Sequence, residues 1–467
     1  MAYNNRIIFS RRSIVAKRIT IIGGGPAGYV AAIRAAQLGG KVTLIEKDAL
    51  GGVCTNRGCI PTKTYYHYAE ILHDLGAAIK DKIFAGEISH DWMRMLRKKD
   101  MIVKRLVKGI EYLMKSNEIR VVEGIGKIAG KSSVEVAGGG GSENIEHDEL
   151  LIATGSVPRE LPIDGWSGSG IWDSTDALNA ESLPESLIII GGGVIGCEFA
   201  HIFATFGCKV TIVEVMDSIL PCFDPDVVEL VTKILAKENI AIRTGVAIEK
   251  IERTAYGVIA HAGDEKFEAA EIMGAVGRTP TPPEGLEEIE VETDRGHIII
   301  DDNLVAAKNI YAAGDVCGDP YLAHWASTMG EIAVENMFGA GKKIQRHAIP
   351  GATFTAIEVG TVGLTEPEAK EKLGEIKVGM FPYQASGRAK TASATDGFAK
   401  VIADKNGVVV GIHIAGRGAS EMLATAGFAV SHRKTLDHWR ETIVAHPTFG
   451  EILRESALDA LGEALHK

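Results

Sequence analysis

The sequence predicts an α/β protein with two Rossmann-like dinucleotide-binding domains and a C-terminal α+β domain. Three observations support this fold class. A glycine-rich turn between a strand and a helix occurs twice in the chain. The apolar content of 46% and the 54 glycines are typical of an α/β protein with many tight turns. After Pro350 the pattern changes to short strands and helices without such a turn. At 467 residues the chain is long enough for several domains.

The composition also excludes several classes of protein. A net charge of -11 argues against a nucleic-acid partner, and no apolar run reaches the roughly 18 residues that a membrane span needs. Six cysteines in so long a chain do not form a disulfide framework. Four of them, Cys197, Cys208, Cys222 and Cys317, are interpreted as reduced packing residues. We therefore expect a cytoplasmic protein without nucleic-acid or membrane partners.

The first 17 residues form a separate extension. This stretch and the next residue carry Arg6, Arg11, Arg12, Lys17 and Arg18 and no acidic residue. Such a segment is typical of organelle targeting sequences, but a frayed N-terminal extension is the simpler interpretation and the one we favour.

Residues 18–149 are predicted to form the first domain. A β-branched strand from Arg18 leads into a glycine turn and an amphipathic helix, and a second strand ends at Glu46. Gly23, Gly25 and Gly28 satisfy the spacing G-x-G-x-x-G, and Glu46 follows 18 positions after Gly28. The glycines let a pyrophosphate approach the helix N-terminus, and Glu46 can accept hydrogen bonds from a ribose. This stretch predicts a dinucleotide site.

The segment GGVCTNRGCIPTK, residues 51–63, places Cys54 and Cys59 five positions apart. In a cytosolic chain such a pair indicates a redox couple, because an ordinary structural disulfide does not persist there. The spacing predicts Cys54 in a loop and Cys59 near the start of a helix, where the helix N-terminus favours a thiolate. The alternatives are two unrelated cysteines or a metal site, and a metal site usually needs a second Cys or His pair. We therefore expect no metal.

The rest of the first domain is less informative. Residues 64–118 are predicted to be helical, with an apolar stripe that indicates core or subunit contact. Residues 119–152 are predicted to form a small antiparallel insertion of short strands around the glycine run 138–141.

Residues 150–277 repeat the dinucleotide pattern. Gly191, Gly193 and Gly196 follow a second apolar strand, and Glu214 again stands 18 positions after the last glycine. Glu214 favours a free ribose 2′-hydroxyl and repels a 2′-phosphate. The residues after it, Val215, Met216 and Asp217, offer no positive charge to hold such a phosphate. The second site is therefore predicted to bind NAD and not NADP.

Two regions follow. Residues 278–347 contain a strand that delivers Asp315 at its end and a helix that begins near Ala323. Residues 348–467 are predicted to be an α+β domain with two helices. Near its end His446 precedes Pro447, and Glu451 follows five positions later. A histidine in this setting is commonly a turn residue, but with Glu451 fixing its tautomer it can also act as a general base.

These motifs together resemble the flavoprotein disulfide reductases. The resemblance rests on GGVCTNRGCIPTK after the first glycine motif, Cys197-Glu198 in the second, AAGDV around Asp315, and HPTFGE near the C-terminus, all in the order of that family. It covers the chain from about Arg18 onward. Within the family, Ile-Pro-Thr-Lys after Cys59 is similar to the lipoamide branch.

The resemblance implies two cofactors, FAD and NAD, and a set of binding residues for each. For FAD these are Gly23, Gly25, Gly28, Glu46, Lys63, Thr154, Gly155, Asp315 and Ala323. For NAD they are Gly191, Gly193, Gly196, Glu214, Gly277 and Arg278.

The resemblance also implies six catalytic residues: Cys54, Cys59, Lys63, Glu198, His446 and Glu451. Cys54 is expected to exchange with the substrate, and Cys59 to contact the flavin. Lys63 is expected to pair with Glu198. His446, oriented by Glu451, is expected to come from the opposite subunit of a homodimer and to take protons from a dithiol.

The implied activity is FAD-dependent oxidation of protein-bound dihydrolipoamide through a Cys54–Cys59 disulfide, with hydride passed to NAD. The implied partners are lipoyl domains of 2-oxo acid dehydrogenase acyltransferases or the carrier protein of glycine cleavage. Departures from the family pattern, among them Val53, Thr55, Val444 and Ile357, remove no catalytic group. Two alternatives remain at this point: an NAD(P)H-linked reductase of another low-molecular-weight disulfide, and a flavin-bearing complex subunit that does not turn over.

Overall fold

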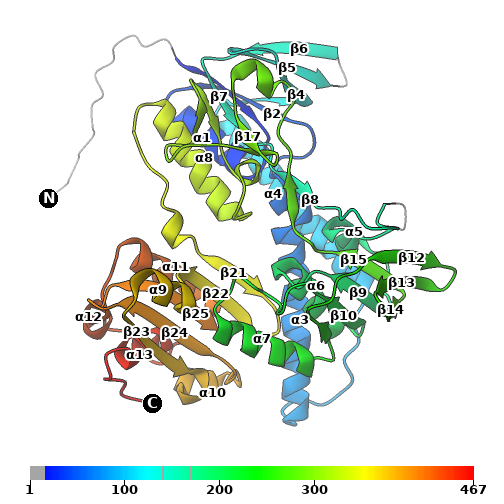
Figure 1. Ribbon diagram of the computed structural model, residues 1–467, viewed down its shortest axis with the longest axis vertical. Helices are drawn as coiled ribbons and strands as arrows, with labels where there is room; N and C mark the ends of the chain where they lie inside the picture. The colour runs from blue at the N-terminus through cyan, green and yellow to red at the C-terminus, as the bar shows by residue number, and fades with distance from the viewer. Residues whose placement is uncertain (1–15, 139–140, 168–169) are drawn as a thin grey trace. The chain divides into compact units, whose positions relative to one another are not determined.

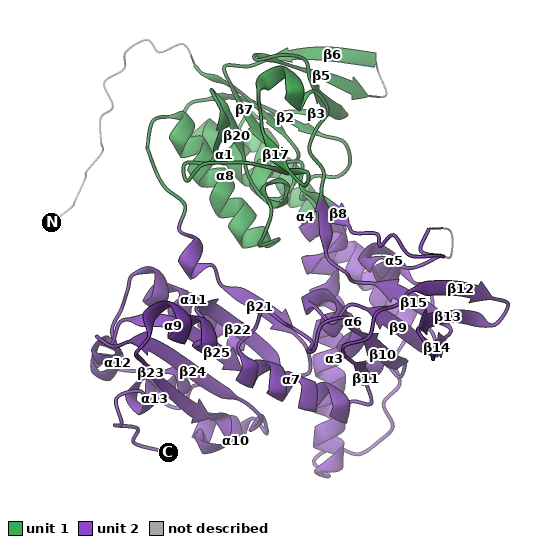
Figure 2. Ribbon diagram, viewed as in Figure 1, with its two compact units in different colours: residues 1–52, 106–156, 280–344 green, residues 53–105, 157–279, 345–467 purple. Residues whose placement is uncertain are grey.

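The protein is described by a computed structural model over residues 16–138, 141–167 and 170–467 (Figure 1). The chain divides into two compact units, each built from three separated stretches (Figure 2). The first unit contains residues 1–52, 106–156 and 280–344, and the second contains residues 53–105, 157–279 and 345–467. The five predicted domain ranges follow chain order and remain a prediction. The predicted extension, residues 1–17, lies outside the described residues except for its last two.

In the described part of the first unit, a six-stranded sheet has the order β19-β20-β7-β1-β2-β3. Its strands run parallel except for the antiparallel pair β19–β20. The strands are β1 (Arg18–Ile22), β2 (Lys41–Glu46), β3 (Arg120–Glu123), β7 (Glu149–Ile152), β19 (Val305–Ala307) and β20 (Ile310–Ala312). Helices α1 (Pro26–Gln37) and α8 (Ala323–Met337) pack against each other. A Cβ at Gly330 would lie 2.3 Å from the carbonyl oxygen of Ala27, so the two helices can approach this closely only with glycine there.

The predicted antiparallel insertion is smaller than the sequence suggested. In the described residues it consists of β4 (Ile125–Ile128), β5 (Ser133–Gly138) and β6 (Gly141–Glu146). Strands β3 and β7 instead join the parallel sheet, beside β2 and β1, and all four residues of β7 are buried. This fits the rule that strands of parallel sheets are covered on both faces. Short elements complete the unit: η1 (Leu286–Ile289), β17 (Thr293–Asp294), β18 (His297–Ile298) and η2 (Asp315–Cys317).

The second unit repeats the strand–glycine turn–helix pattern. Within its described residues, parallel strands take the order β11-β10-β9-β15, and β12, β13 and β14 form an antiparallel sheet. The bounds are β9 (Ser186–Ile190), β10 (Lys209–Val213), β11 (Ala241–Arg243), β12 (Lys250–Thr254), β13 (Gly257–Ala262), β14 (Glu265–Ala269) and β15 (Glu271–Gly274). The helices are α5 (Ser174–Asn179), α6 (Val194–Thr205) and α7 (Pro225–Lys237). Strands β8 (Ser156–Pro158) and β16 (Arg278–Pro280) lie where the chain passes from one unit to the other.

The helical region after the first glycine motif differs from the prediction in two ways. It contains α2 (Gly52–Arg57), α3 (Cys59–Lys80) and α4 (Trp92–Ser116), with a break from 81 to 91. Cys59 begins α3 as expected, but Cys54 lies in the short helix α2 and not in a loop. Gly51 and Gly52 have φ values of +93° and +57°, so the chain turns at once into this helix. The loop prediction was wrong because this glycine turn shortens the entry.

The last part of the second unit is a five-stranded antiparallel sheet with the order β21-β22-β25-β24-β23 in the described residues. Its strands are β21 (Gly351–Phe354), β22 (Glu358–Gly363), β23 (Ile376–Pro382), β24 (Phe398–Asp404) and β25 (Val409–Ala415). Five described α-helices accompany it, where the sequence predicted two: α9 (Glu366–Leu373), α10 (Gly387–Thr391), α11 (Ala419–Ser431), α12 (Leu436–Glu441) and α13 (Glu451–Asp459). The turns η3 (Arg346–Ala348) and η4 (Tyr383–Ala385) precede β21 and α10.

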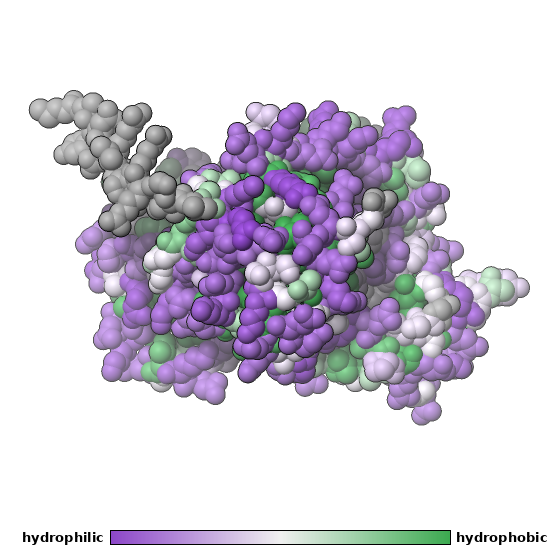
Figure 3. Space-filling view, turned by 90° about the horizontal axis from the view of Figure 1, so that it is seen from above, coloured by the Kyte–Doolittle hydropathy of each residue, from purple (hydrophilic) through white to green (hydrophobic). Residues whose placement is uncertain are grey.

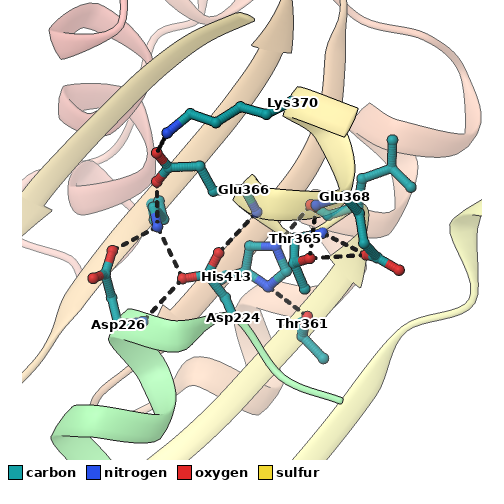
Figure 4. A network of polar contacts seen from close by, with 10 residues as sticks. Asp224, Asp226, Thr361, Thr365, Glu366, Glu368, Lys370 and His413 are labelled. Carbon is teal, nitrogen blue, oxygen red and sulfur yellow. Dashed lines mark hydrogen bonds and ion pairs between the residues drawn. The ribbon is translucent and has the colours of Figure 1, made fainter. Parts of the chain in front are cut away.

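A buried ionic network joins α7 to this C-terminal sheet (Figure 4). The Asp224 carboxylate accepts the N–H groups of Asp226 at 3.2 Å and Glu366 at 3.0 Å, so it caps the N-termini of α7 and α9 together. The Lys400 ammonium, 3% exposed, neutralises it at 2.9 Å and also contacts the carboxylates of Asp226 and Glu366. One carboxylate and one ammonium therefore hold elements that are more than 140 residues apart in the sequence.

The described residues contain no helix that is both long and apolar enough to cross a membrane. The face of the molecule seen in Figure 3 is mostly hydrophilic, with small scattered hydrophobic areas.

Candidate active site

The two glycine motifs have nearly identical geometry, one in each unit. Gly23 and Gly191 adopt φ values of +104° and +106°, and a Cβ on either would lie within 2.4 Å of a carbonyl oxygen in the neighbouring strand end. A Cβ on Gly28 or Gly196 would lie within 2.0 Å of the carbonyl oxygen of Gly23 or Gly191, so these positions admit only glycine. The middle glycine differs: among the described residues beyond its chain neighbours, the nearest atom to a Cβ on Gly25 would be 3.8 Å away, and a Cβ on Gly193 would have none within 4 Å.

These open glycines are the N-caps of α1 and α6, with φ/ψ of -71°/-172° and -72°/-174°. Bare backbone thus faces open space at a helix N-terminus, where N–H groups and the helix dipole attract an anion. We call each of these glycine turns, with its helix N-terminus, a cradle. The repeated spacing in the sequence predicted both cradles.

An acidic residue closes each cradle in the same way. One oxygen of Glu46 accepts the N–H of Gly24 at 2.6 Å, and the other accepts the N–H of Asp48 at 2.8 Å. Glu214 accepts the N–H groups of Gly192 and Met216 at 2.6 and 2.7 Å. Both carboxylates are less than 10% exposed. They are fixed beside the glycine turn, and each oxygen keeps a lone pair for a ribose hydroxyl.

The remaining residues predicted for FAD fit a dinucleotide at the first cradle. Thr154 directly follows Ala153, which Gly23 touches, and its buried hydroxyl has no hydrogen-bond partner among the described residues. Gly155 adopts a φ of +74°. Asp315 begins η2 and accepts the Ser156 hydroxyl at 2.5 Å, and Ala323 is the first residue of α8, as predicted. These residues all belong to the first unit, whereas Lys63 belongs to the second.

The residues predicted for NAD lie in the second unit. Gly277 has a φ of +100°, and its carbonyl accepts the N–H of Arg159 at 3.0 Å. Arg278 begins β16. Beyond Glu214, the side chains of Val215 and Met216 are 63% and 53% exposed, so they are free to meet a bound nucleotide.

The two candidate redox cysteines are thiols that interact directly. Both belong to the second unit, and Gly58 is the N-cap of α3, so Cys59 is its first residue. A hydrogen bond from the Cys54 thiol lowers the pKa of Cys59, and although burial opposes this, the Lys63 charge lowers it further. The same hydrogen bond and burial raise the pKa of Cys54. These directions favour Cys59 over Cys54 as the site of a thiolate.

Lys63 lies one helical turn beyond Cys59 on α3. Its ammonium donates to both oxygens of Glu198, at 2.8 and 2.7 Å. The Glu198 side chain, on α6, is 5% exposed, whereas that of Lys63 is 32% exposed. The two contacts to one buried carboxylate fix the direction of the ammonium.

His446 and Glu451 form a second catalytic candidate pair. The ring Nδ1 of His446 lies 2.9 Å from one Glu451 oxygen, and the other oxygen accepts the N–H of Thr448 at 2.8 Å. Burial raises the pKa of Glu451, but hydrogen bonds from His446 and Thr448 outweigh it, so the net effect lowers that pKa. With Nδ1 donating to a carboxylate, Nε2 is free to accept a proton.

The His446 side chain is 77% exposed and lines an open cavity of about 440 Å³ together with Glu451, Arg454 and His466. Neither Cys54 nor Cys59 lines this cavity. The structure thus joins Cys54, Cys59, Lys63 and Glu198 in one cluster and places His446 with Glu451 in another. Sequence reasoning missed Phe354, which contacts Glu198 from 156 positions away and Lys63 from farther still, because no local spacing signals such contacts.

Comparison with known proteins agrees with this arrangement. Residues 17–330 match the family Pyridine nucleotide-disulphide oxidoreductase, and residues 349–457 match the dimerisation domain of that family. The chain therefore belongs to the pyridine nucleotide-disulphide oxidoreductases. The second match supports a homodimer.

Individual relatives cover nearly the whole chain. A dihydrolipoyl dehydrogenase of Halobacterium salinarum is 40% identical over 96% of this chain and 97% of that protein. A dihydrolipoyl dehydrogenase of Bacillus subtilis is 37% identical over 96% and 99%. Among solved structures, LpdA from Mycobacterium tuberculosis superimposes with a TM-score of 0.89 at 27% identity, covering 95% of this chain and 99% of that one. The HOCl-induced flavoprotein disulfide reductase RclA from Escherichia coli gives 0.85 at 30%, covering 94% and 99%.

These findings confirm the predicted fold class, the family and the function of a flavoprotein disulfide oxidoreductase that uses FAD and NAD. The roles of individual site residues stay predictions.

Proposed function

We propose that this protein is a dihydrolipoyl dehydrogenase that oxidises protein-bound dihydrolipoamide to lipoamide and reduces NAD. The observation that carries the proposal is the cluster of Cys54, Cys59 and Lys63 on α2 and α3, in a chain whose relatives with that name align over nearly their full length. In the first half-reaction a Cys54–Cys59 disulfide takes two electrons from the substrate dithiol. The products are lipoamide and two cysteine thiols.

The division of labour between the cysteines follows from their protonation. Cys59 is the better thiolate because Cys54 donates to it and Lys63 lies near it. Cys54, whose pKa is raised, is the thiol that exchanges with substrate and releases it. FAD, when bound, accepts an electron pair from the thiol side and gives it up as hydride to NAD. Gly25 and Gly193 offer the two dinucleotides their separate cradles.

His446 is proposed as the base for the dithiol. A dithiol must lose a proton before its sulfur attacks a disulfide, so the substrate side needs a base with a pKa near the working pH. Glu451 holds Nδ1 of His446 and leaves Nε2 to accept that proton. We propose that this histidine acts on the cysteine pair of the partner subunit.

The partners proposed are a second copy of this chain and lipoyl domains, either of 2-oxo acid dehydrogenase acyltransferases or of a glycine-cleavage carrier protein. The proposed location is the cytoplasm, which suits a cysteine pair that must be reduced and reoxidised in each cycle.

The test is a steady-state assay of the purified holoenzyme with dihydrolipoamide and NAD. A second assay tests the reduction of glutathione disulfide by NADPH under the same conditions. We expect turnover with dihydrolipoamide and NAD and at least a hundredfold lower kcat/KM with the other pair. Cys54→Ser is expected to abolish turnover of dihydrolipoamide with NAD. Cys222→Ser, at an exposed cysteine outside the cluster, is expected to leave this turnover unchanged.

Two results contradict the proposal. A preference for glutathione disulfide or another small disulfide would make the protein a reductase of that compound. A holoenzyme that binds FAD but turns over neither pair would make it a non-catalytic flavin-bearing subunit.

A further inference from the structure

Phe354 stands beside the Lys63–Glu198 pair, although neither the sequence motifs nor the proposed mechanism include it. It is the last residue of β21, within the stretch that matches the dimerisation domain. Its backbone N–H donates to a Glu198 oxygen at 3.0 Å. Its ring centroid lies 4.5 Å from the Lys63 ammonium nitrogen. A single residue therefore contacts both members of the ion pair, one through its backbone and the other through its ring.

The two contacts constrain Lys63 in different ways. The Glu198 carboxylate attracts the ammonium, and its own position is fixed by the Phe354 N–H. The aromatic face attracts the same ammonium, because the negative face of a ring favours a cation within about 6 Å of its centroid. Lysine is a flexible four-carbon side chain. Held between a carboxylate and a ring, it loses most of that freedom.

The ring of Phe354 is itself held in place. Tyr66, one turn beyond Lys63 on α3, packs edge-on against it with centroids 5.3 Å apart and an interplanar angle of 72°. Tyr66 is only 6% exposed. In the next residue, the Thr355 hydroxyl donates to the carbonyl of Ile357 at 2.8 Å and tightens the turn between β21 and β22. The ring is thus a fixed surface and not a mobile neighbour.

We propose that Phe354 is a positioning residue that holds the Lys63 ammonium against Glu198, one helical turn from Cys59. The dimerisation domain would then serve the cysteine pair of its own chain through β21, in addition to presenting His446 to a partner. This inference rests on the proposed roles of Cys59 and Lys63. The charged and titratable groups that act on Cys59 are Cys54, Lys63 and Glu198, from α2, α3 and α6. Loosening Lys63 leaves Cys59 with less positive charge nearby.

The experiment measures the thiolate of Cys59 in the Cys54→Ser holoenzyme, where it has no neighbouring thiol. Two readouts are followed against pH: the rate of alkylation of Cys59 by iodoacetamide, and the long-wavelength absorption that a thiolate gives beside an oxidised flavin. With Phe354→Leu, which keeps the backbone N–H and an apolar side chain, we expect the pKa of Cys59 to rise by about half a unit. Phe354→Tyr, which keeps the ring, is expected to restore the original value.

Two controls separate positioning from a general structural effect. Phe338→Leu makes the same change at another ring that lies under a lysine, Lys17 at 5.8 Å, and is expected to leave Cys59 unaffected. In a Lys63→Met background, Phe354→Leu is expected to produce no further shift, because the ring then has no ammonium to hold. If Phe354→Leu gives no folded holoenzyme, Phe354→Met takes its place.

The inference is overturned if Phe354→Leu leaves the pKa of Cys59 unchanged, or shifts it equally with and without Lys63. Neither readout depends on which disulfide is the substrate. A failure of this inference can therefore be told apart from a failure of the proposed function, which the turnover assay with dihydrolipoamide decides.

Discussion

We expect Glu214 to select NAD over NADP at the second cradle. Its oxygens are fixed by the N–H groups of Gly192 and Met216, so the carboxylate cannot swing away from a 2′-phosphate. We expect Glu214→Ala with Met216→Arg to shift the ratio of kcat/KM for NAD over NADP by at least about tenfold toward NADP. This follows because a hydrogen bond to a charged group contributes about 1.5–3 kcal/mol. Met216→Arg alone is expected to keep most of the preference for NAD.

An unchanged ratio in the double variant would show that another residue decides the selectivity. The single variant serves as the control for any general effect of the added charge.

His147 is expected to make stability depend on pH. It is 2% exposed, and burial, followed by the Arg18 charge, lowers its pKa from 6.5 to about 4. Between these values the unfolded chain binds a proton and the folded chain does not, so stability is complete above about pH 6.5 and is lost as pH falls toward 4. When the pH falls from 7 to 5.5, the free energy of unfolding, measured in urea, should decrease by about 1 kcal/mol less for His147→Gln than for the parent protein.

The control is His347→Gln at an exposed position, which is expected to keep the parent's pH dependence. Parallel pH profiles for the parent and His147→Gln would rule out His147 as a source of the acid sensitivity.

The junction of α7 and α9 shows how elements from distant parts of the chain are held together. Asp224 is completely buried, and its charge is balanced chiefly by Lys400. Removing one partner of a buried pair leaves an uncompensated charge and costs about 3–5 kcal/mol. We therefore expect Lys400→Met to destabilise the protein by roughly that amount in urea unfolding.

Lys370→Met is the matched control, because Lys370 pairs with the same Glu366 but is 60% exposed. Exposed pairs contribute about 0–1 kcal/mol. If both variants were destabilised equally, the buried network would not hold these elements.

The elements that the sequence predicted best are those whose local pattern repeats. The structure places both glycine turns and the helices that follow them where the motif spacing predicted, and the same holds for Glu46 and Glu214. The spacing is informative because the turn admits only glycine at Gly23 and Gly28. The start of α3 at Cys59 and of α8 at Ala323 was also predictable from sequence. Cys54 was misplaced because the turn at Gly51 and Gly52 leads directly into a six-residue helix, which carries too little periodicity to be recognised.

Contacts between distant segments escaped prediction for a different reason. Strand β7 looks like its neighbours in sequence, and only its pairing with β1 shows that it belongs to the parallel sheet. Phe354 and Lys400 are ordinary residues in ordinary strands, and their importance appears only when α3, α6 and α7 are placed against the C-terminal sheet. Local patterns contain no information on such pairings.

The complete active molecule is expected to be a dimer in which each site uses two chains. His446 and Glu451 lie on the domain that matches the family's dimerisation domain, and the cysteine pair lies elsewhere. Inactive Cys54→Ser and inactive His446→Ala proteins, after subunit exchange, should form mixed dimers with one intact site. Random exchange predicts recovery of about a quarter of the parent activity.

A mixture of Cys54→Ser with Cys59→Ser is the control and should stay inactive, because no chain then supplies an intact pair. Mixed dimers that are shown to form and remain inactive would place His446 on the cysteines of its own chain, or outside the reaction.

The measurement that bears most directly on the proposed reaction follows the thiols of the holoenzyme through one anaerobic cycle. Oxidised protein is mixed with dihydrolipoamide, half is then treated with NAD, and both samples are alkylated and mapped by mass spectrometry. We expect Cys54 and Cys59 to be alkylated after dihydrolipoamide and protected again after NAD. Buried Cys197 and Cys208, whose pKa values burial raises to about 12, should be unchanged throughout. Formation of NADH while Cys54 and Cys59 keep the same alkylation in both samples would contradict the mechanism.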